Sequence, residues 1–254
     1  MTKDLSGLLG DLIAVADEAG VEIMRQYGSA EIRAKPDASP VTDADEAAEA
    51  IILERLAALT PDIAVVAEES VAAGHEPGNL GAAFWLVDPL DGTKEFISGN
   101  GEFTVNIALV KDGLPVMGVV GAPAKDLLYA TDGNAVTRRS GGTTEGVSAR
   151  KPPSEGLYAA VSRSHLDEKS KAYLTQFAIA GTKSAGSSLK FCLVAEGTAD
   201  VYPRFGRTME WDTAAGHAVV RAAGGSVCDA DGSELAYGKP GFENPSFIVR
   251  GRTD

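Results

Sequence analysis

The stretch Trp85–Phe96, WLVDPLDGTKEF, brings two aspartates together at the end of an apolar run. The run itself is typical of a buried strand, and Asp88 and Asp91 follow it directly. Two carboxylates this close repel each other unless a positive charge lies beside them. The motif therefore indicates a site for a cation at the end of the strand.

The residues around the two aspartates suit a metal and a phosphate. Pro89 fixes φ at about −65° and is expected to hold both aspartates on the inner side of a tight turn. Gly92 lets the backbone approach a ligand without a Cβ. Thr93 offers a hydroxyl, and the amides of Gly92 and Thr93 can donate to a phosphate at the N-terminus of a following helix.

Two further acidic segments lie where strands end or helices start. VVAEES ends a predicted strand with Glu68 and Glu69, and EWDTAAGHAVV places Asp212 at the start of a predicted helix. Such segments converge on a cleft in layered α/β proteins. Carboxylate oxygens favour Mg²⁺, whereas three histidines without paired spacing and two cysteines without CxxC spacing disfavour zinc.

Each acidic residue has a simpler explanation when it is taken alone. Asp212 could cap its helix, and Glu69 could be a solvated or hydrogen-bonded acid. Asp45, three residues after the helix-capping Thr42, could only favour the helix dipole. However, it is much less probable that all of these acids converge by chance than that the simple explanation holds for any one of them.

Hydrophobic periodicity predicts the elements that position these residues. Helices are expected up to Gly28 and from Thr42 to Pro61, with a loop over 28–40 between them. Strands are expected over 63–67 and 84–87. From 103 to 138, period-two alternation predicts an antiparallel meander with Asp-Gly turns at 112–113 and 132–133.

Glycine- and proline-containing segments near residue 150 predict a boundary between two subdomains. Residues 1–150 would form an N-terminal α+β subdomain with the first acidic motifs, and residues 151–254 a C-terminal α/β subdomain. In the second, strands near 157–161, 200–205, 227 and 247–250 alternate with helices from about 167, over 188–197 and from about 212. The predicted fold class is α/β, two stacked α/β layers that share a cleft.

Composition restricts the class of protein. The chain has 254 residues and a net charge of −13, and this acidic excess disfavours nucleic-acid binding. We expect no integral membrane segment, because no apolar run approaches the ~20 residues of a spanning helix. The acidic, amphipathic N-terminus does not look like a secretion signal, so a cytoplasmic enzyme is expected.

Several motifs together resemble one known family. AEES, WLVDPLDGTKEF and WDTAAGHAVVRAAGG are similar, in order and spacing, to the metal-dependent inositol monophosphatase superfamily. SPVTDAD, SRSH and GSSLKFCLVAEGTADVYPRFG, with Lys94-Glu95-Phe96 after DGT, resemble its 3'(2'),5'-bisphosphate nucleotidase branch, of the CysQ type. The resemblance runs from about Lys35 to Gly225. It implies a layered α-β-α-β-α sandwich of the metal-dependent sugar phosphatase type, with a largely antiparallel N-terminal sheet and a second, smaller α/β layer.

The resemblance also implies metal ligands. Glu68, Asp88 and the Leu90 carbonyl would hold one Mg²⁺, and Asp88 would bridge to another held by Asp91 and Asp212. Two or three Mg²⁺ per active site are expected.

The implied catalytic residues are Asp45, Thr93 and Glu68. Thr93, hydrogen-bonded to Asp45, would orient a metal-bound water for in-line attack on phosphorus.

A bisphosphate needs a second anion site, which protein cations can supply. The family pattern implies the following substrate-binding residues: Gly92, Thr93, Lys94, Ser162, Arg163, His165, Ser187, Ser188, Lys190, Arg204 and Asp212. Taken alone, Lys190 would be a solvated helix lysine and His165 a polar loop residue.

The leading hypothesis is a Mg²⁺-dependent phosphatase that converts adenosine 3',5'-bisphosphate to AMP and phosphate in sulfur assimilation. The family implies 3'-phosphoadenylyl sulfate as a second candidate substrate, and sensitivity to Li⁺. An inositol monophosphatase or sugar bisphosphatase, and a non-catalytic nucleotide or metal sensor, stay open as alternatives. The expected partner is a small phosphorylated nucleotide. The expected assembly is a monomer or a homodimer, and peripheral association at the inner membrane is left open.

Overall fold

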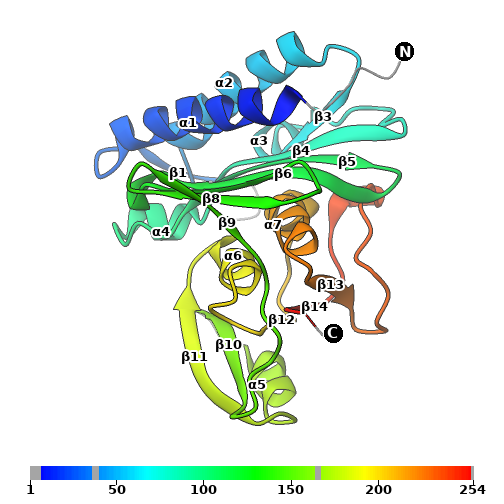
Figure 1. Ribbon diagram of the computed structural model, residues 1–254. Helices are drawn as coiled ribbons and strands as arrows, with labels where there is room; N and C mark the ends of the chain where they lie inside the picture. Colours follow the sequence, from blue (N-terminus) through cyan, green and yellow to red (C-terminus); the bar gives the residue numbers. More distant parts are fainter. Residues whose placement is uncertain (1–6, 36–39, 164–166, 253–254) are drawn as a thin grey trace.

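The computed structural model describes residues 7–35, 40–163 and 167–252, and it stacks helices and sheets in five layers (Figure 1). Helices α1 (Leu8–Gln26) and α2 (Asp43–Leu59) lie on the outer face of the first sheet. The α1 residues Leu8, Leu12, Val15, Ala16, Ala19 and Ile23 are buried, as the hydrophobic periodicity of this segment predicts. The layered α-β-α-β-α sandwich is therefore confirmed.

The first sheet has seven strands in the order β3-β4-β5-β6-β7-β8-β9, and all neighbours except β3 and β4 pair antiparallel. Their bounds are β3 Ala64–Ala67, β4 Ala83–Asp91, β5 Thr104–Lys111, β6 Leu114–Ala122, β7 Leu127–Thr131, β8 Val136–Ser140 and β9 Thr143–Val147. The predicted meander and its Asp-Gly turns are present, with Asp112 and Gly113 both at positive φ. The largely antiparallel N-terminal sheet is confirmed.

The second sheet has five strands in the order β11-β10-β12-β14-β13. Their bounds are β10 Leu157–Ser162, β11 Ile179–Ala185, β12 Val201–Arg204, β13 Ser226–Asp229 and β14 Phe247–Arg250. Strand β10 pairs parallel with β11 and β12, and the other pairs are antiparallel.

Two helices fill the space between the sheets. Helix α7 (Glu210–Ala222) packs on β5 and β6 and also contacts β13, while α6 (Leu189–Ala195) packs on α7, β10 and β12. The two helices approach closely at Gly216, where a Cβ would lie 2.5 Å from Phe191 Cγ. Helix α5 (Glu168–Leu174) covers the other face of the second sheet, with Asp167 as its N-cap.

Three regions differ from the sequence-based expectation. The predicted loop over 28–40 contains strand β1 (Ile32–Ala34), which pairs with β2 (Pro40–Thr42). The segment GGTTEG, residues 141–146, one of the glycine-containing segments near the expected subdomain boundary, forms the turn before β9 and most of that strand. Strand β11 was missed, because its sequence IAGTKSA has little apolar character.

The DPLD motif also differs from the expected tight turn. Strand β4 continues through Asp88 to Asp91, and its pairing with β5 becomes irregular between these two residues. The tight turn instead comes at Gly92, which has φ 91° and precedes the short helix α4 (Thr93–Ile97). Strand β3 likewise ends directly at another short helix, α3 (Glu68–Ala72).

The predicted division near residue 150 falls between β9 and β10, where the chain passes from the first sheet to the second. Helix α7 crosses this division, because it follows residue 150 in sequence and packs on the first sheet. The division into two subdomains stays a prediction.

In the described ranges, no helix is both long and apolar enough to cross a membrane. Cys192 is buried and Cys228 partly buried, both as free thiols.

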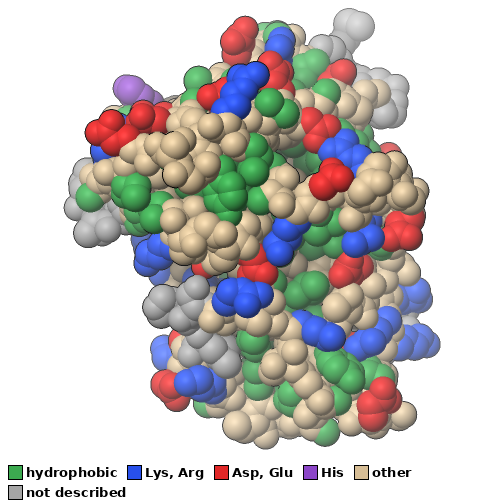
Figure 2. All heavy atoms as spheres, turned by 90° about the vertical axis from the view of Figure 1, so that its left-hand side faces the viewer, with side chains coloured by type: hydrophobic (Ala, Val, Ile, Leu, Met, Phe, Trp, Pro, Cys, Tyr) green, Lys and Arg blue, Asp and Glu red, His purple; other side chains and the backbone are tan. Residues whose placement is uncertain are grey.

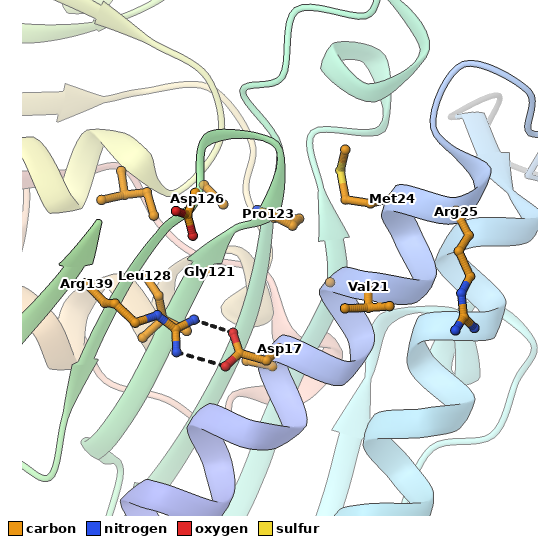
Figure 3. Close-up of a pocket in the computed structure, with 13 residues that line it drawn as sticks. Asp17, Val21, Met24, Arg25, Gly121, Pro123, Asp126, Leu128 and Arg139 are labelled. Atoms are coloured by element: carbon orange, nitrogen blue, oxygen red, sulfur yellow. Dashed lines mark hydrogen bonds and ion pairs between the residues drawn. The ribbon is translucent and has the colours of Figure 1, made fainter. Parts of the chain in front are cut away.

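One face carries exposed hydrophobic side chains together with a groove. Hydrophobic side chains gather in the upper part of the face that Figure 2 displays. Val21 and Met24 of α1 are exposed. Both side chains line an open cavity of about 470 Å³ between α1 and β6–β8, with Asp17 paired to Arg139 at its edge (Figure 3). None of the predicted site residues that the structure describes lines this cavity.

Candidate active site

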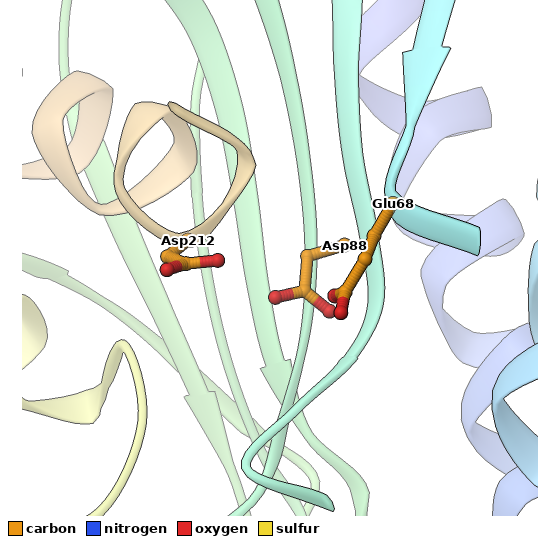
Figure 4. A group of neighbouring side chains, drawn as sticks. All are labelled: Glu68, Asp88 and Asp212. Carbon is orange, nitrogen blue, oxygen red and sulfur yellow. The ribbon is translucent and has the colours of Figure 1, made fainter. Parts of the chain in front are cut away.

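Three carboxylates from distant parts of the chain meet at the inner edge of the first sheet. Glu68 begins α3, Asp88 lies on β4 and Asp212 lies in the first turn of α7; the three side chains point toward one another (Figure 4). One oxygen of each lies within 4.8 Å of the others. Hard oxygen donors at this spacing suit Mg²⁺, so the residues present fit the ion implied by the sequence.

Backbone hydrogen bonds fix the positions of two of these carboxylates. Asp88 Oδ1 accepts from the Leu90 amide at 3.0 Å, and Asp212 Oδ2 accepts from the Met209 amide at 2.8 Å. The second bond is a helix-capping contact, so the simple explanation for Asp212 holds beside the metal-ligand prediction.

Glu68 is positioned by a residue that sequence reasoning missed. The Glu49 carboxylate, buried on α2, accepts hydrogen bonds from the Glu69 and Ser70 amides at 2.8 Å each and thus fixes the start of α3. No local sequence signal marks Glu49, because its partners lie 20 and 21 positions further along the chain.

The carboxylates of the acidic cluster are buried and repel one another. Burial, together with the neighbouring carboxylates Glu68, Asp91 and Asp212, raises the pKa of Asp88 well above its ordinary value. Burial and the charges of Asp91 and Glu68 likewise raise the pKa of Asp212. A bound cation would relieve this repulsion, which is the physical reason for expecting one.

A lysine neutralises the outer side of the cluster. Lys35 Nζ lies 2.6 Å from Glu68 Oε1 and 2.7 Å from Glu69 Oε1. Burial opposes its charge, but the two glutamates outweigh burial and raise the pKa of Lys35. Burial raises the pKa of Glu69 to about 7, and the hydrogen bond from Lys35 limits that rise.

Asp91 lies beside the three carboxylates of Glu68, Asp88 and Asp212, and Ser188 holds it. Ser188 Oγ lies 3.1 Å from Asp91 Oδ2 and 2.7 Å from the Asp212 carbonyl oxygen, and it accepts from Asn106 Nδ2 at 3.0 Å. Ser188 is only 1% exposed. This burial favours a positioning role for Ser188, whose predicted contact with substrate stays a prediction.

The predicted catalytic pair lies within hydrogen-bond reach. Thr93 Oγ1 lies 3.2 Å from Asp45 Oδ1 and 3.4 Å from the Leu90 carbonyl oxygen. Asp45 Oδ2 accepts from both the amide and the hydroxyl of Thr42. Asp45 therefore caps α2 and reaches Thr93 at the same time, so both explanations of this residue hold geometrically.

A cavity of about 300 Å³ opens beside the acidic cluster and extends toward the second sheet. Eight predicted site residues line it: Asp91, Gly92, Lys94, Ser162, Ser187, Lys190, Arg204 and Asp212. Sequence reasoning missed its aromatic residues, Phe191, Tyr202 and Phe247, which are also core residues.

Lys190 is the buried cation of this cavity. It is 5% exposed, its Nζ donates to the Ser187 carbonyl at 2.6 Å, and it lies over the Tyr202 ring. The solvated surface lysine considered from sequence is therefore excluded. Burial lowers the pKa of Lys190 to about 8, and the charge of Asp91 opposes that fall.

The other basic candidates lie in different surroundings, and Lys94 of α4 also lines the cavity. Arg204, at the end of β12, lines the cavity, and its terminal nitrogen donates to the Arg207 carbonyl at 3.2 Å. Arg163 is paired with Glu102, from Nε at 2.6 Å, and is half exposed. His165 lies outside the described residues.

The chain is similar to known proteins of one family. The model of the inositol monophosphatase family matches residues 4–250. The 3'(2'),5'-bisphosphate nucleotidase CysQ of Salmonella typhimurium is 49% identical over 249 residues, which cover 95% of this chain and 99% of that protein. The protein of the same name from Escherichia coli K12 is 46% identical, with the same coverage.

Solved structures of related proteins have the same fold as this chain. The crystal structure of CysQ from Bacteroides thetaiotaomicron matches with a TM-score of 0.82 and 39% identity, covering 98% of each chain. An inositol monophosphatase from Anabaena matches with a TM-score of 0.77 and 25% identity, covering 99% of this chain and 93% of that one. The fold, the acidic cluster and these likenesses lead to one conclusion: this chain belongs to the inositol monophosphatase family.

Proposed function

We propose that this protein is a 3'(2'),5'-bisphosphate nucleotidase that removes the 3'-phosphate of adenosine 3',5'-bisphosphate to give AMP and phosphate. The observation that carries the proposal is the meeting of an acidic cluster and a cavity with a buried lysine, in a chain 49% identical to a nucleotidase of this name. A second candidate substrate is 3'-phosphoadenylyl sulfate, which has the same 3'-phosphate.

The site has an acidic half, formed by the carboxylates of Glu68, Asp88, Asp91 and Asp212 at and beside one end of the cavity, which would hold two or three Mg²⁺ ions. Glu68, Asp88 and the Leu90 carbonyl are the proposed ligands of one ion, and Asp88, Asp91 and Asp212 those of another. Bound Mg²⁺ supplies charge neutralisation for the phosphoryl group and activation of water. The raised pKa values of Asp88, Asp91 and Asp212 support a need for such a cation.

Thr93 and Asp45 would orient the attacking water. The Thr93 hydroxyl donates to Asp45 and thereby keeps its lone pairs free to accept from water. Asp45 is held by two hydrogen bonds from Thr42, so the pair is preorganised on α2 and the start of α4.

The basic half would hold the phosphate that is not cleaved. Lys190, Arg204 and Lys94 line the cavity in a chain that is otherwise acidic. An ammonium group removed from water interacts strongly with an anion, because little solvent screens it. A monophosphate would use only the acidic half, and a bisphosphate would use both.

The remaining expectations rest on the sequence. A role in sulfur assimilation, sensitivity to Li⁺, a cytoplasmic location and a monomeric or dimeric state stay predictions.

Release of phosphate from three substrates tests the proposal. The purified protein with Mg²⁺ is assayed side by side on adenosine 3',5'-bisphosphate, inositol 1-phosphate and fructose 1,6-bisphosphate. We expect kcat/KM to be at least about tenfold higher for the nucleotide. The three substrates would share the metal chemistry of the acidic half, so the residues that contact the rest of the substrate must distinguish them. A preference for inositol 1-phosphate or fructose 1,6-bisphosphate would instead support the alternative activity. No turnover of any of the three would favour a non-catalytic sensor.

A further inference from the structure

Glu102 is a buried acid that the sequence motifs did not single out. It lies between α4 and β5, and it is 7% exposed. Its carboxylate accepts from Arg163 Nε at 2.6 Å, from the Arg163 terminal nitrogen at 2.8 Å and from the Gly186 amide at 2.8 Å. Lys125 Nζ lies 3.5 Å away. One carboxylate of the N-terminal half, in the loop before β5, thus binds two separate segments of the C-terminal half.

The charge of Glu102 is stabilised at this place. Burial alone would raise its pKa, but the hydrogen bonds from Arg163 and Gly186 and the charge of Lys125 bring the pKa below its ordinary value. The carboxylate is therefore ionised at neutral pH, and its hydrogen bonds are charge-assisted.

The segment that Glu102 holds is the turn before α6, residues 186–188. Gly186 is pressed against Glu102, since a Cβ on it would lie 2.5 Å from the Glu102 carbonyl oxygen. Ser187 has a positive φ of 49°, which is uncommon for a residue other than glycine. Its Oγ lies 2.8 Å from the carbonyl oxygens of both Asp91 and Glu102.

This turn connects the two halves of the cavity. Its last residue, Ser188, contacts Asp91 and the Asp212 carbonyl, and Lys190, in the first turn of α6, lines the cavity. Arg163, the second partner of Glu102, directly follows Ser162 at the end of β10. A shift of the Glu102 carboxylate would therefore move the basic half relative to the acidic half.

We propose that Glu102 is a positioning residue, which sets the distance between the two halves of the cavity through Arg163 and the turn 186–188. The role rests on the proposed function, because it concerns a substrate that uses both halves. Arg163 acts through Glu102 and does not itself contact the substrate. A surface ion pair alone would not have this effect, but here the acid is buried and also binds a backbone amide.

The test compares two substrates in four variants. Glu102→Gln, Arg163→Ala and the double variant are measured on adenosine 3',5'-bisphosphate and on p-nitrophenyl phosphate, which occupies only the acidic half. Glu145→Gln is the matched control, since Glu145 is an exposed acid paired with Arg138 at 2.8 Å and does not line the cavity. Melting temperatures are recorded for all variants.

We expect Glu102→Gln to lower kcat/KM on the bisphosphate about tenfold, mainly through KM, and to change turnover of p-nitrophenyl phosphate less than about threefold. The double variant should lose no more than the larger single loss, because both changes break the same contact. The control should stay within about twofold of the wild type.

Three results would overturn the positioning role. Equal losses on both substrates with a lowered melting temperature would make Glu102 a general stabilising residue. Losses that multiply in the double variant would mean that Arg163 contacts the substrate directly. Unchanged kinetics would remove any role. Failure of the proposed function would show earlier, as absent turnover of the bisphosphate by the wild-type protein, and would remove the positioning role with it.

Discussion

The two halves of the cavity are built in different ways. The acidic half comes from strand ends and helix starts, and backbone amides fix Asp88 and Asp212. The basic half comes from α4, the end of β12 and α6, and α6 follows a turn whose shape depends on Ser187 and Glu102. A substitution in the basic half can therefore leave the carboxylates of the acidic half in place. This means that substrate selectivity can change without a change in the phosphoryl-transfer chemistry.

The largest expected effect comes from breaking the acidic half. Asp88→Asn removes the proposed bridging carboxylate, and a neutral amide binds Mg²⁺ poorly. Loss of several kcal/mol of transition-state stabilisation corresponds to a fall in kcat of about a thousandfold or more. Steady-state kinetics with Mg²⁺ on every substrate should show this fall equally, with the exposed Asp62→Asn as control. Near wild-type turnover would exclude Asp88 as a ligand.

Thr93→Val should have the next largest effect. It removes the hydroxyl 3.2 Å from Asp45 and keeps the shape of the side chain, so kcat should fall about a hundredfold while KM changes little. Thr93→Ser keeps the hydroxyl and should restore most of the rate. A rise in KM at constant kcat would assign Thr93 to binding instead.

The basic half should show itself in pH dependence. The pKa of Lys190 is about 8, so its ammonium group loses its charge as pH rises through that value, and affinity for the bisphosphate should fall. We expect kcat/KM on the bisphosphate to decline about tenfold between pH 7 and pH 9. In Lys190→Met, kcat/KM on the bisphosphate should be low at pH 7 and should change little between pH 7 and pH 9. A decline of the same size in this variant would mean that another group titrates.

The smallest expected effect is on stability. Mg²⁺ at about ten times its dissociation constant should stabilise the folded protein by about 1.4 kcal/mol, which corresponds to about 3–6 °C in Tm for a chain of this length. Differential scanning fluorimetry checks this shift. Asp88→Asn should reduce it, whereas Lys190→Met should retain it, because Lys190 belongs to the other half. An equal shift in both variants would place the ion elsewhere.

The acidic half could be predicted from sequence because contiguous motifs encode it. The apolar run before Asp88 and the helix after Asp212 each fix where a carboxylate lies, and both expectations agree with the structure. Glu49 could not be predicted, because its hydrogen bonds join α2 to the start of α3, and nothing local marks such a contact.

The basic half was harder to predict for the same reason. Strand β11 has little apolar character, so periodicity missed the strand that precedes the turn at 186–188. The residues next to Lys190 in α6 are apolar, but a lysine among apolar residues can still reach solvent. Its burial follows from the packing of α6 between the sheets, which the sequence does not show. The pairing of Arg163 with Glu102 joins residues 61 positions apart, beyond any local signal.

The identity of the product tests the central claim most directly. If the acidic half takes the phosphate that is cleaved and the basic half retains the other, adenosine 3',5'-bisphosphate must lose only its 3'-phosphate. Phosphorus NMR of the reaction in Mg²⁺ should then show inorganic phosphate and the 5'-phosphate of AMP in equal amounts. Formation of adenosine 3'-phosphate would contradict the account, since the two halves would hold the substrate in the opposite orientation.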